Sequence, residues 1–206
     1  EANPDVLVFD SGDFSQGSPY YTLFKGSVET ELMSAMKYDA VAIGNHEFDF
    51  GLENMARIFR EAKFPIVCAN YDFRGTVVDG LTKPYVILKR NGLRIGVFGV
   101  SPKLDGLVDA TKCVGVKYLD PVATDDKKCD VVICLSHLGW DMQDDVDDAD
   151  MLAQNHDIDL VLGGHSHSYF TELKYAPNAD GKPIPDDQNG KHAVFVGKIK
   201  LSVERK

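Results

Sequence analysis

Short apolar runs alternate with helical patterns and polar turns along the chain. Uninterrupted apolar residues predict buried strands at 6–9, 40–43, 66–69, 131–135 and 160–162. Amphipathic periodicity predicts a helix over 27–36, with Ser27 as its cap, and a second helix over 52–62. An acidic helix is predicted over 144–155.

Two Asn-Gly pairs predict β-hairpins later in the chain. Asn91-Gly92 lies between two apolar runs of the segment 85–100, and Asn189-Gly190 precedes an alternating segment over 193–203 that reads as a strand. Strands that alternate with helices and are then joined by hairpins favour an α/β fold with parallel and antiparallel parts. The link 121–130 is too short for a crossover helix, so either it is not a crossover or residues are missing from it.

Composition and charge limit the possible partners. With 206 residues, of which 44% are apolar, the chain is expected to form a single domain over 1–206. The net charge of −10 argues against binding a nucleic-acid polymer or an anionic membrane surface. No apolar run approaches the roughly 20 residues of a membrane-spanning helix. Cys68 and Cys134 fall within apolar runs and are expected to be buried thiols.

Polar side chains follow four of the predicted strands. The segment after each strand carries residues of the types that bind metals, namely Asp13 in SGD, Asn45, His46, Glu47 and Asp49 in GNHEFD, His137 in SHLGWD, and His165 and His167 in GGHSH. The carboxyl ends of strands in open α/β sheets face one crevice, so these segments are expected to converge. Each motif alone is typical of an ordinary turn, and only their recurrence favours a common site.

The ligand types indicate two divalent metal ions. A set of one Asp, one Asn and three His from these segments supplies oxygen and imidazole nitrogen without thiolate, which suits Mn, Fe or Zn. These five candidate ligands exceed the three that a single catalytic zinc takes from protein. Two such ions can clamp the attacking and leaving oxygens of a phosphate ester. His165 and His167 are expected to reach the metals together as alternate residues of an extended segment. His156 and His192 lack this context and are assigned to structure.

The motifs GNHEFDFG, SHLG and GGHSH resemble those of calcineurin-like metallophosphatases, over essentially the whole chain. Within that family they are similar to the 5′-nucleotidase group, which also contains 2′,3′-cyclic nucleotide phosphodiesterases and UDP-sugar hydrolases. The resemblance implies a four-layer αββα sandwich of two mixed β-sheets flanked by helices, with a dinuclear metal site between the strand ends. It implies the following metal ligands: Asp13 bridging both ions, Asn45, His137 and His165 on one ion, and His167 on the other.

The resemblance also implies that His46 is a catalytic residue that meets the phosphoryl group, with Asp49 as its orienting partner. From the residues alone, a carboxylate three positions along a turn can orient an imidazole, and Glu47 remains an alternative to Asp49. Asn45 and His46 are the expected substrate-binding residues. We hypothesise that His46 stabilises charge on the transferred phosphoryl group or protonates the leaving oxygen.

The expected activity is metal-dependent hydrolysis of phosphate esters, with nucleotides as the first candidate substrates. Alternatives are a 2′,3′-cyclic nucleotide phosphodiesterase, a nucleotide-sugar pyrophosphatase and, from another class, a non-catalytic metal-stabilised binding domain. Members of the family begin with an Asp-x-His motif that supplies two ligands to one ion, and no Asp lies two residues before a His here. The domain is therefore expected to be truncated at its N-terminus, with Asp13 and His167 alone on one ion and with low or no activity.

Two further expectations rest on the resemblance. Two-domain 5′-nucleotidases carry a C-terminal nucleotide-binding domain, which is not recognised within these 206 residues. A separate domain or subunit would then have to hold the nucleoside. Many relatives with this motif are exported in bacteria, which favours a periplasmic or extracellular location.

Overall fold

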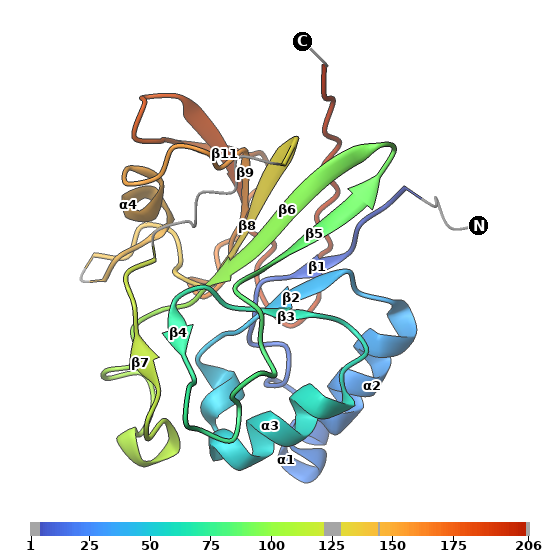
Figure 1. Ribbon diagram of the computed structural model, residues 1–206, viewed down its shortest axis with the longest axis vertical. Helices are drawn as coiled ribbons and strands as arrows, with labels where there is room; N and C mark the ends of the chain where they lie inside the picture. Colours follow the sequence, from blue (N-terminus) through green and yellow to red (C-terminus); the bar gives the residue numbers. More distant parts are fainter. Residues whose placement is uncertain (1–4, 122–128, 144, 205–206) are drawn as a thin grey trace.

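Two β-sheets pack face to face in the computed structural model, which describes residues 5–121, 129–143 and 145–204 (Figure 1). The smaller sheet contains three parallel strands, β1 (Phe9–Asp10), β2 (Ala40–Ala42) and β3 (Ile66–Val67). The larger sheet is mixed, and its strand order is β10 (Lys174–Pro177), β11 (Pro183–Asp187), β9 (Leu160–Leu162), β8 (Val131–Ser136), β6 (Leu93–Val100) and β5 (Tyr85–Arg90).

Helices cover the outer faces of both sheets. Below the smaller sheet in Figure 1 lie α1 (Pro19–Phe24), α2 (Ser27–Met36) and α3 (Gly51–Glu61), and α4 (Asp148–Leu152) lies on the far side of the larger sheet. The described residues also form two short 3₁₀ helices, η1 (His46–Phe48) and η2 (Ala110–Lys112). None of the helices in the described ranges is long and apolar enough to cross a membrane.

Successive side chains along each strand point to opposite faces of its sheet, and this alternation produces the layers of the fold. In β2, Val41 packs into the cluster beneath α3, whereas Ala40 and Ala42 pack between the two sheets. In β6, Val97 faces the same inter-sheet cluster, and Phe98 packs on the other side with residues of α4. Both faces of each sheet are therefore buried, and the predicted four-layer αββα arrangement is confirmed.

The two sheets approach most closely where β6 crosses β2 and β3. A Cβ atom on Gly99 would lie 2.3 Å from the Val67 carbonyl oxygen and 3.2 Å from the Ala42 Cβ atom. Only a residue without a side chain fits this position. Small residues in the middle of both sheets thus allow the strand ends of one sheet to meet those of the other.

The hairpin at 85–100 is confirmed. Asn91 and Gly92 both have positive φ, 51° and 75°, as a type I′ turn requires, and they join β5 to β6 in antiparallel register. The helix at 27–36 is also confirmed, but its predicted cap is wrong. Gly26, with φ 93°, occupies the N-cap position, and Ser27 is the first helical residue. The Ser27 hydroxyl instead donates to Glu61 Oε2 at 3.0 Å.

The acidic helix predicted over 144–155 is much shorter in the structure, although residue 144 lies outside the described ranges. Asp147 accepts from the backbone N–H of Asp150 at 3.0 Å, and the Asp150 side chain completes a capping box. This box starts α4 at Asp148 and ends the preceding loop. The sequence argument also missed α1, whose start is marked by Ser18 as N-cap and Pro19 in the first turn.

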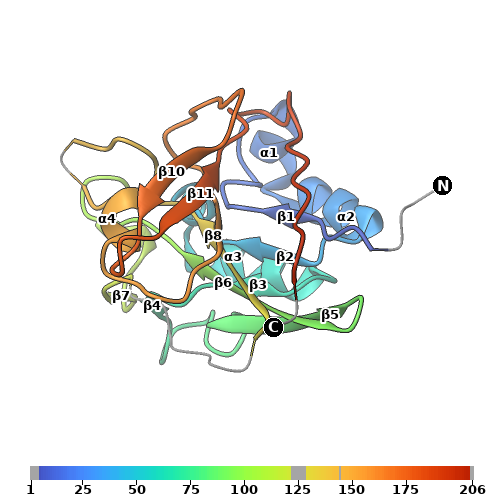
Figure 2. The same cartoon turned by 90° about the horizontal axis from the view of Figure 1, so that it is seen from above.

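The strand predicted over 193–203 is not formed. His192 and Ala193 have positive φ, 62° and 50°, and the residues that follow them up to 204 join no sheet ladder. The segment passes β1 without pairing to it (Figure 2). Ile199 packs against the inter-sheet cluster, whereas Val196 is 90% exposed. The alternation of apolar and polar residues alone therefore gave a wrong prediction, because the segment has no ladder partner among the described strands.

The short link at 121–130 does not connect neighbouring strands of one sheet. It follows β7 (Lys117–Tyr118), which pairs antiparallel with β4 (Tyr71–Asp72) in a separate ribbon. β8 pairs in parallel with β6, which precedes β7 in the chain, and with β9, which follows β8. No crossover helix is needed at this link, whose residues 122–128 lie outside the described ranges.

Candidate metal centre

The loops after β1 and β2 touch through two glycines. The chain turns after Asp10 through Gly12, at φ 97°, and Asp13, at φ 60°. A Cβ atom on Gly12 would lie 2.5 Å from the Gly44 nitrogen, and one on Gly44 would lie 2.1 Å from Asp13 Oδ1. The close approach brings the Asp13 carboxylate to the end of β2.

Glu47 fastens these two loops together. Its buried carboxylate accepts from the backbone N–H groups of Gly44, Asp13 and Ser15 at 2.7, 2.9 and 3.2 Å, and from the Ser15 hydroxyl at 3.0 Å. Burial and the Asp13 charge raise the pKa of Glu47, against the lowering effect of the bound N–H groups. Sequence reasoning named Glu47 among the metal-type residues and as a possible partner of His46, and it missed this role.

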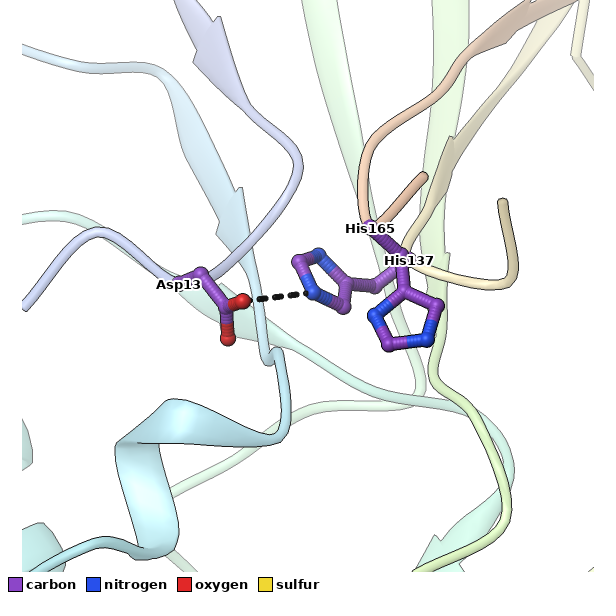
Figure 3. Close-up of side chains that lie close together, drawn as sticks. All are labelled: Asp13, His137 and His165. Carbon is purple, nitrogen blue, oxygen red and sulfur yellow. Dashed lines mark ion pairs between the residues drawn. The ribbon is translucent and has the colours of Figure 1, made fainter. Parts of the chain in front are cut away.

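Asp13, His137 and His165 bring one ligand atom each to within 4.8 Å of one another (Figure 3). Asp13 Oδ2 lies 3.0 Å from His137 Nε2, and the centroids of the two imidazole rings are 5.1 Å apart. Asp13 follows a strand of the smaller sheet, whereas the histidines follow β8 and β9 of the larger sheet. The predicted convergence of these strand ends is thus present.

The buried ring of His137 is fixed by its second nitrogen. Because the Ser11 carbonyl oxygen lies 2.7 Å from Nδ1, this nitrogen carries a proton and donates it, and Nε2 points toward Asp13. Burial lowers the pKa of His137, but the Asp13 carboxylate outweighs it and the net shift is upward. For Asp13, burial raises the pKa, and hydrogen bonding to His137 more than compensates.

Two buried side-chain atoms fit a divalent cation. Asn45 Oδ1 makes no hydrogen bond within the part of the chain that the structure describes, and His137 Nε2 faces the Asp13 carboxylate, itself a metal-type ligand, at 3.0 Å. A buried unsatisfied polar atom costs about 1–3 kcal/mol, which a bound cation would offset. Burial and the neighbouring His137 lower the pKa of His165 to about 4, so its imidazole is neutral at pH 7, as a metal ligand must be.

The segment that carries His165 and His167 does not have the expected extended conformation. His165 and His167 have φ of 66° and 56°, both left-handed, so the segment is coiled and the prediction of an extended segment is wrong. His167 is exposed and lies outside the three-residue cluster. Its assignment to a second ion stays a prediction.

His46 sits beside this cluster on η1. Its backbone N–H donates to Asp13 Oδ1 at 2.8 Å, and its ring Nδ1 lies 3.1 Å from both carboxylate oxygens of Asp49. Lys112 Nζ donates to the backbone carbonyl oxygen of Asp49. The Tyr21 hydroxyl donates to the backbone carbonyl oxygen of His46 at 3.1 Å. Asp49, and not Glu47, is the carboxylate that orients the imidazole.

Comparison with known proteins identifies the family. Residues 1–169 match the family model of calcineurin-like phosphoesterases. The chain belongs to this family. It is 34% identical over 207 residues to human 5′-nucleotidase, an alignment that covers 95% of this chain and 34% of that protein. The recognition from sequence motifs is thereby confirmed.

Solved structures agree with the family. The crystal structure of a 5′-nucleotidase precursor from Thermus thermophilus matches with a TM-score of 0.80 and 27% identity, over 91% of this chain and 40% of that one. The calcineurin-like phosphoesterase YfkN from Bacillus subtilis matches with a TM-score of 0.72 and 27% identity, over 91% and 68%. The chain spans about a third of the length of its curated relatives.

The remaining histidines lie outside the three-residue cluster. His156 forms an exposed pair with Asp180, with 3.0 Å between Nδ1 and Oδ1, and His192 has the left-handed backbone that turns the chain after Gly190. Both positions agree with their assignment to structure. Cys68 and Cys134 are buried free thiols, as expected.

Proposed function

We propose that this chain is a divalent-metal-dependent phosphoesterase that hydrolyses nucleotides in the manner of a 5′-nucleotidase. The observation that carries the proposal is the juxtaposition of the Asp13, His137 and His165 cluster with the oriented His46–Asp49 pair. The first set suits a metal that holds a phosphate ester. The second suits a proton donor or a charge-stabilising group at the same ester.

The proposed ligand roles are those that the family resemblance implies. Asp13, Asn45, His137 and His165 would hold one ion, which the Asp13, His137 and His165 cluster supports, and Asp13 and His167 would contribute to a second. When bound, a pair of divalent ions neutralises phosphate charge and lowers the pKa of a coordinated water. Because Asp13 and His167 are fewer than the three protein ligands of a typical catalytic zinc site, we expect the second ion to bind more weakly.

His46 would act on the phosphoryl group directly. With Nδ1 on the Asp49 carboxylate, Nε2 is the ring nitrogen left to donate to a phosphoryl or leaving oxygen. The net charge of −10 opposes an anionic substrate over most of the surface. Selectivity for a phosphate ester would therefore depend on the ions and on donors such as His46.

The substrate class and setting rest on the relatives. Human 5′-nucleotidase and the Thermus thermophilus 5′-nucleotidase precursor support a nucleotide substrate. The family resemblance favours an exported, periplasmic or extracellular protein. Since the chain spans about a third of its curated relatives, we propose that a separate nucleotide-binding domain or subunit completes the contacts to the nucleoside.

A substrate panel tests the activity. The protein loaded with Mn²⁺ or Zn²⁺ is assayed against nucleoside 5′-monophosphates, 2′,3′-cyclic nucleotides, a UDP-sugar and p-nitrophenyl phosphate. We expect slow release of phosphate from the 5′-monophosphates, because only Asp13 and His167 are assigned to the second ion. Preference for a cyclic nucleotide or UDP-sugar would support the alternative enzymes. A protein that binds metal and hydrolyses none of these would be a non-catalytic binding domain.

The variant His46→Ala tests the catalytic assignment. Loss of the donor is expected to lower turnover about 10²- to 10⁴-fold while the bound metal content stays unchanged. Metal content is measured by atomic emission on the same sample. His156→Ala is the matched control, because it removes an exposed histidine paired with Asp180, and it should keep both activity and metal. Loss of metal from His46→Ala would instead identify His46 as a ligand.

A further inference from the structure

A buried polar network lies behind the two histidine-bearing loops of the larger sheet. Its centre is Asp148, the first residue of α4, which is fully buried. Asp186 on β11 and the nearby Gln188 are buried beside it. None of these side chains belongs to the proposed metal ligands. Ionisable and amide groups this deeply buried are costly unless their hydrogen bonds are satisfied.

The hydrogen bonds of this network run toward the Asp148 carboxylate. The Ser136 hydroxyl donates to its Oδ1, and Gln188 Nε2 donates to its Oδ2 at 3.4 Å. Gln188 Oε1 in turn accepts from the Ser166 hydroxyl at 2.8 Å. The two hydroxyls also accept, Ser136 from the N–H of Leu138 and Ser166 from the N–H of Trp140, both at 3.1 Å. Each hydroxyl group is thus fixed in orientation by a donor on one side and an acceptor on the other.

Asp186 is the second carboxyl group of this network. Both of its oxygens are buried and make no hydrogen bond within the described residues. Burial, followed by the charge of Asp148, raises the pKa of Asp186. The raised pKa favours the neutral carboxyl group, which does not repel the Asp148 carboxylate.

The network ends next to the candidate ligands. Ser136 immediately precedes His137, and Ser166 lies between His165 and His167. Gly163 permits the approach, because a Cβ atom there would lie 2.7 Å from Gln188 Nε2 and 2.9 Å from Asp148 Oδ2. One buried carboxylate therefore holds the loop after β8 and the loop after β9 at the same time.

We propose that Asp148 is a positioning residue that sets the relative placement of His137 and His165 for a divalent ion. The proposal rests on the proposed function, which gives that ion its catalytic role. Asp148 touches neither the cluster nor a substrate. It acts through Ser136 on one loop and through Gln188 and Ser166 on the other.

The variant Asp148→Asn tests the proposal in the metal-free protein by ¹H–¹⁵N NMR of the histidine rings. An amide keeps the size of the side chain but loses one acceptor and the charge, so the ring signals of His137 and His165 are expected to shift. The exposed His156 signal should stay in place, which a general loss of structure would not allow. Mn²⁺ affinity, measured by calorimetric titration, is expected to fall about 10- to 100-fold.

Asp147→Asn is the matched control. It makes the same substitution one residue earlier, at a half-buried N-cap where asparagine caps equally well, and it should leave the rings and the Mn²⁺ affinity unchanged. Unmoved His137 and His165 signals in Asp148→Asn, or an equal effect in Asp147→Asn, would overturn the proposal.

A milder variant keeps the test decisive if Asp148→Asn does not fold. Ser166→Ala removes the link from Gln188 to the loop after β9, together with the bond from the Trp140 N–H, and leaves the Ser136–Asp148 contact in place. The His165 signal should therefore move more than that of His137. An unmoved His165 would contradict the proposal. Failure of the proposed function is read separately: a wild-type protein that binds Mn²⁺ but hydrolyses no ester would refute it, while the NMR comparison would still decide the role of Asp148.

Discussion

At the scale of single residues, Glu47 is the strongest test of how the site is built. Four hydrogen bonds converge on its carboxylate, and three of them come from backbone N–H groups that cannot turn toward another acceptor. Glu47→Gln would turn an NH₂ group toward one of these donors. We expect the free energy of unfolding to fall by about 1–3 kcal/mol, measured in urea.

Glu61→Gln serves as the comparison for this prediction. Glu61 pairs with Arg57 at 3.2 Å with both side chains well exposed, so its loss should change the free energy of unfolding by less than about 1 kcal/mol. If Glu47→Gln were no less stable than Glu61→Gln, the fastening role of Glu47 would be wrong.

The sequence predicted the residue types of the site better than their geometry. The spacing of His46 and Asp49 implied contact, because residues three apart lie one above the other in a 3₁₀ helix. The structure forms such a helix here, η1. The left-handed backbone of His165 and His167 could not be predicted, since non-glycine residues seldom adopt it. Glu47 was overlooked for a related reason, because local spacing does not tell which of several neighbouring carboxylates turns inward.

At the scale of elements, Gly99 on β6 controls how closely the two sheets pack. The added methyl group of Gly99→Ala would meet the backbone of β3, which cannot rotate away, so the sheets would have to separate. We expect a loss of about 3 kcal/mol in the free energy of unfolding, followed by circular dichroism. Gly106→Ala is the control: its Cβ would meet open space, and only its φ of +81° costs about 1–2 kcal/mol. Equal losses would argue against tight contact at Gly99.

Continuous apolar runs predicted the buried strands β2, β3, β8 and β9 because both faces of each are covered. Elements that depend on a distant partner were harder to predict. The tail at 193–203 alternates like a strand but pairs with none of the described strands. The strands β4 and β7 have only two residues each and are formed by pairing with one another. The short α4 was misjudged because acidic residues favour both a helix and the loop before its capping box.

At the scale of the whole molecule, the candidate metal centre joins the two sheets. Asp13 is carried by the smaller sheet, and His137 and His165 by the larger one, so an ion held by all three would cross-link the halves of the sandwich. Such an ion binds the folded chain and not the unfolded one, in which these residues are far apart. Binding must therefore raise the free energy of unfolding by mass action.

The size of this effect can be predicted. With free Mn²⁺ or Zn²⁺ at about 100 times its dissociation constant, the gain is about 2.7 kcal/mol, which for a chain of this length corresponds to a rise in Tm of roughly 5–10 °C. EDTA should reverse the rise in a thermal melt. His165→Ala removes one ligand from the larger sheet and should lose most of it, whereas His156→Ala should keep it in full. A rise that survives in His165→Ala would mean that the ion stabilises the fold from another place and does not bridge the sheets.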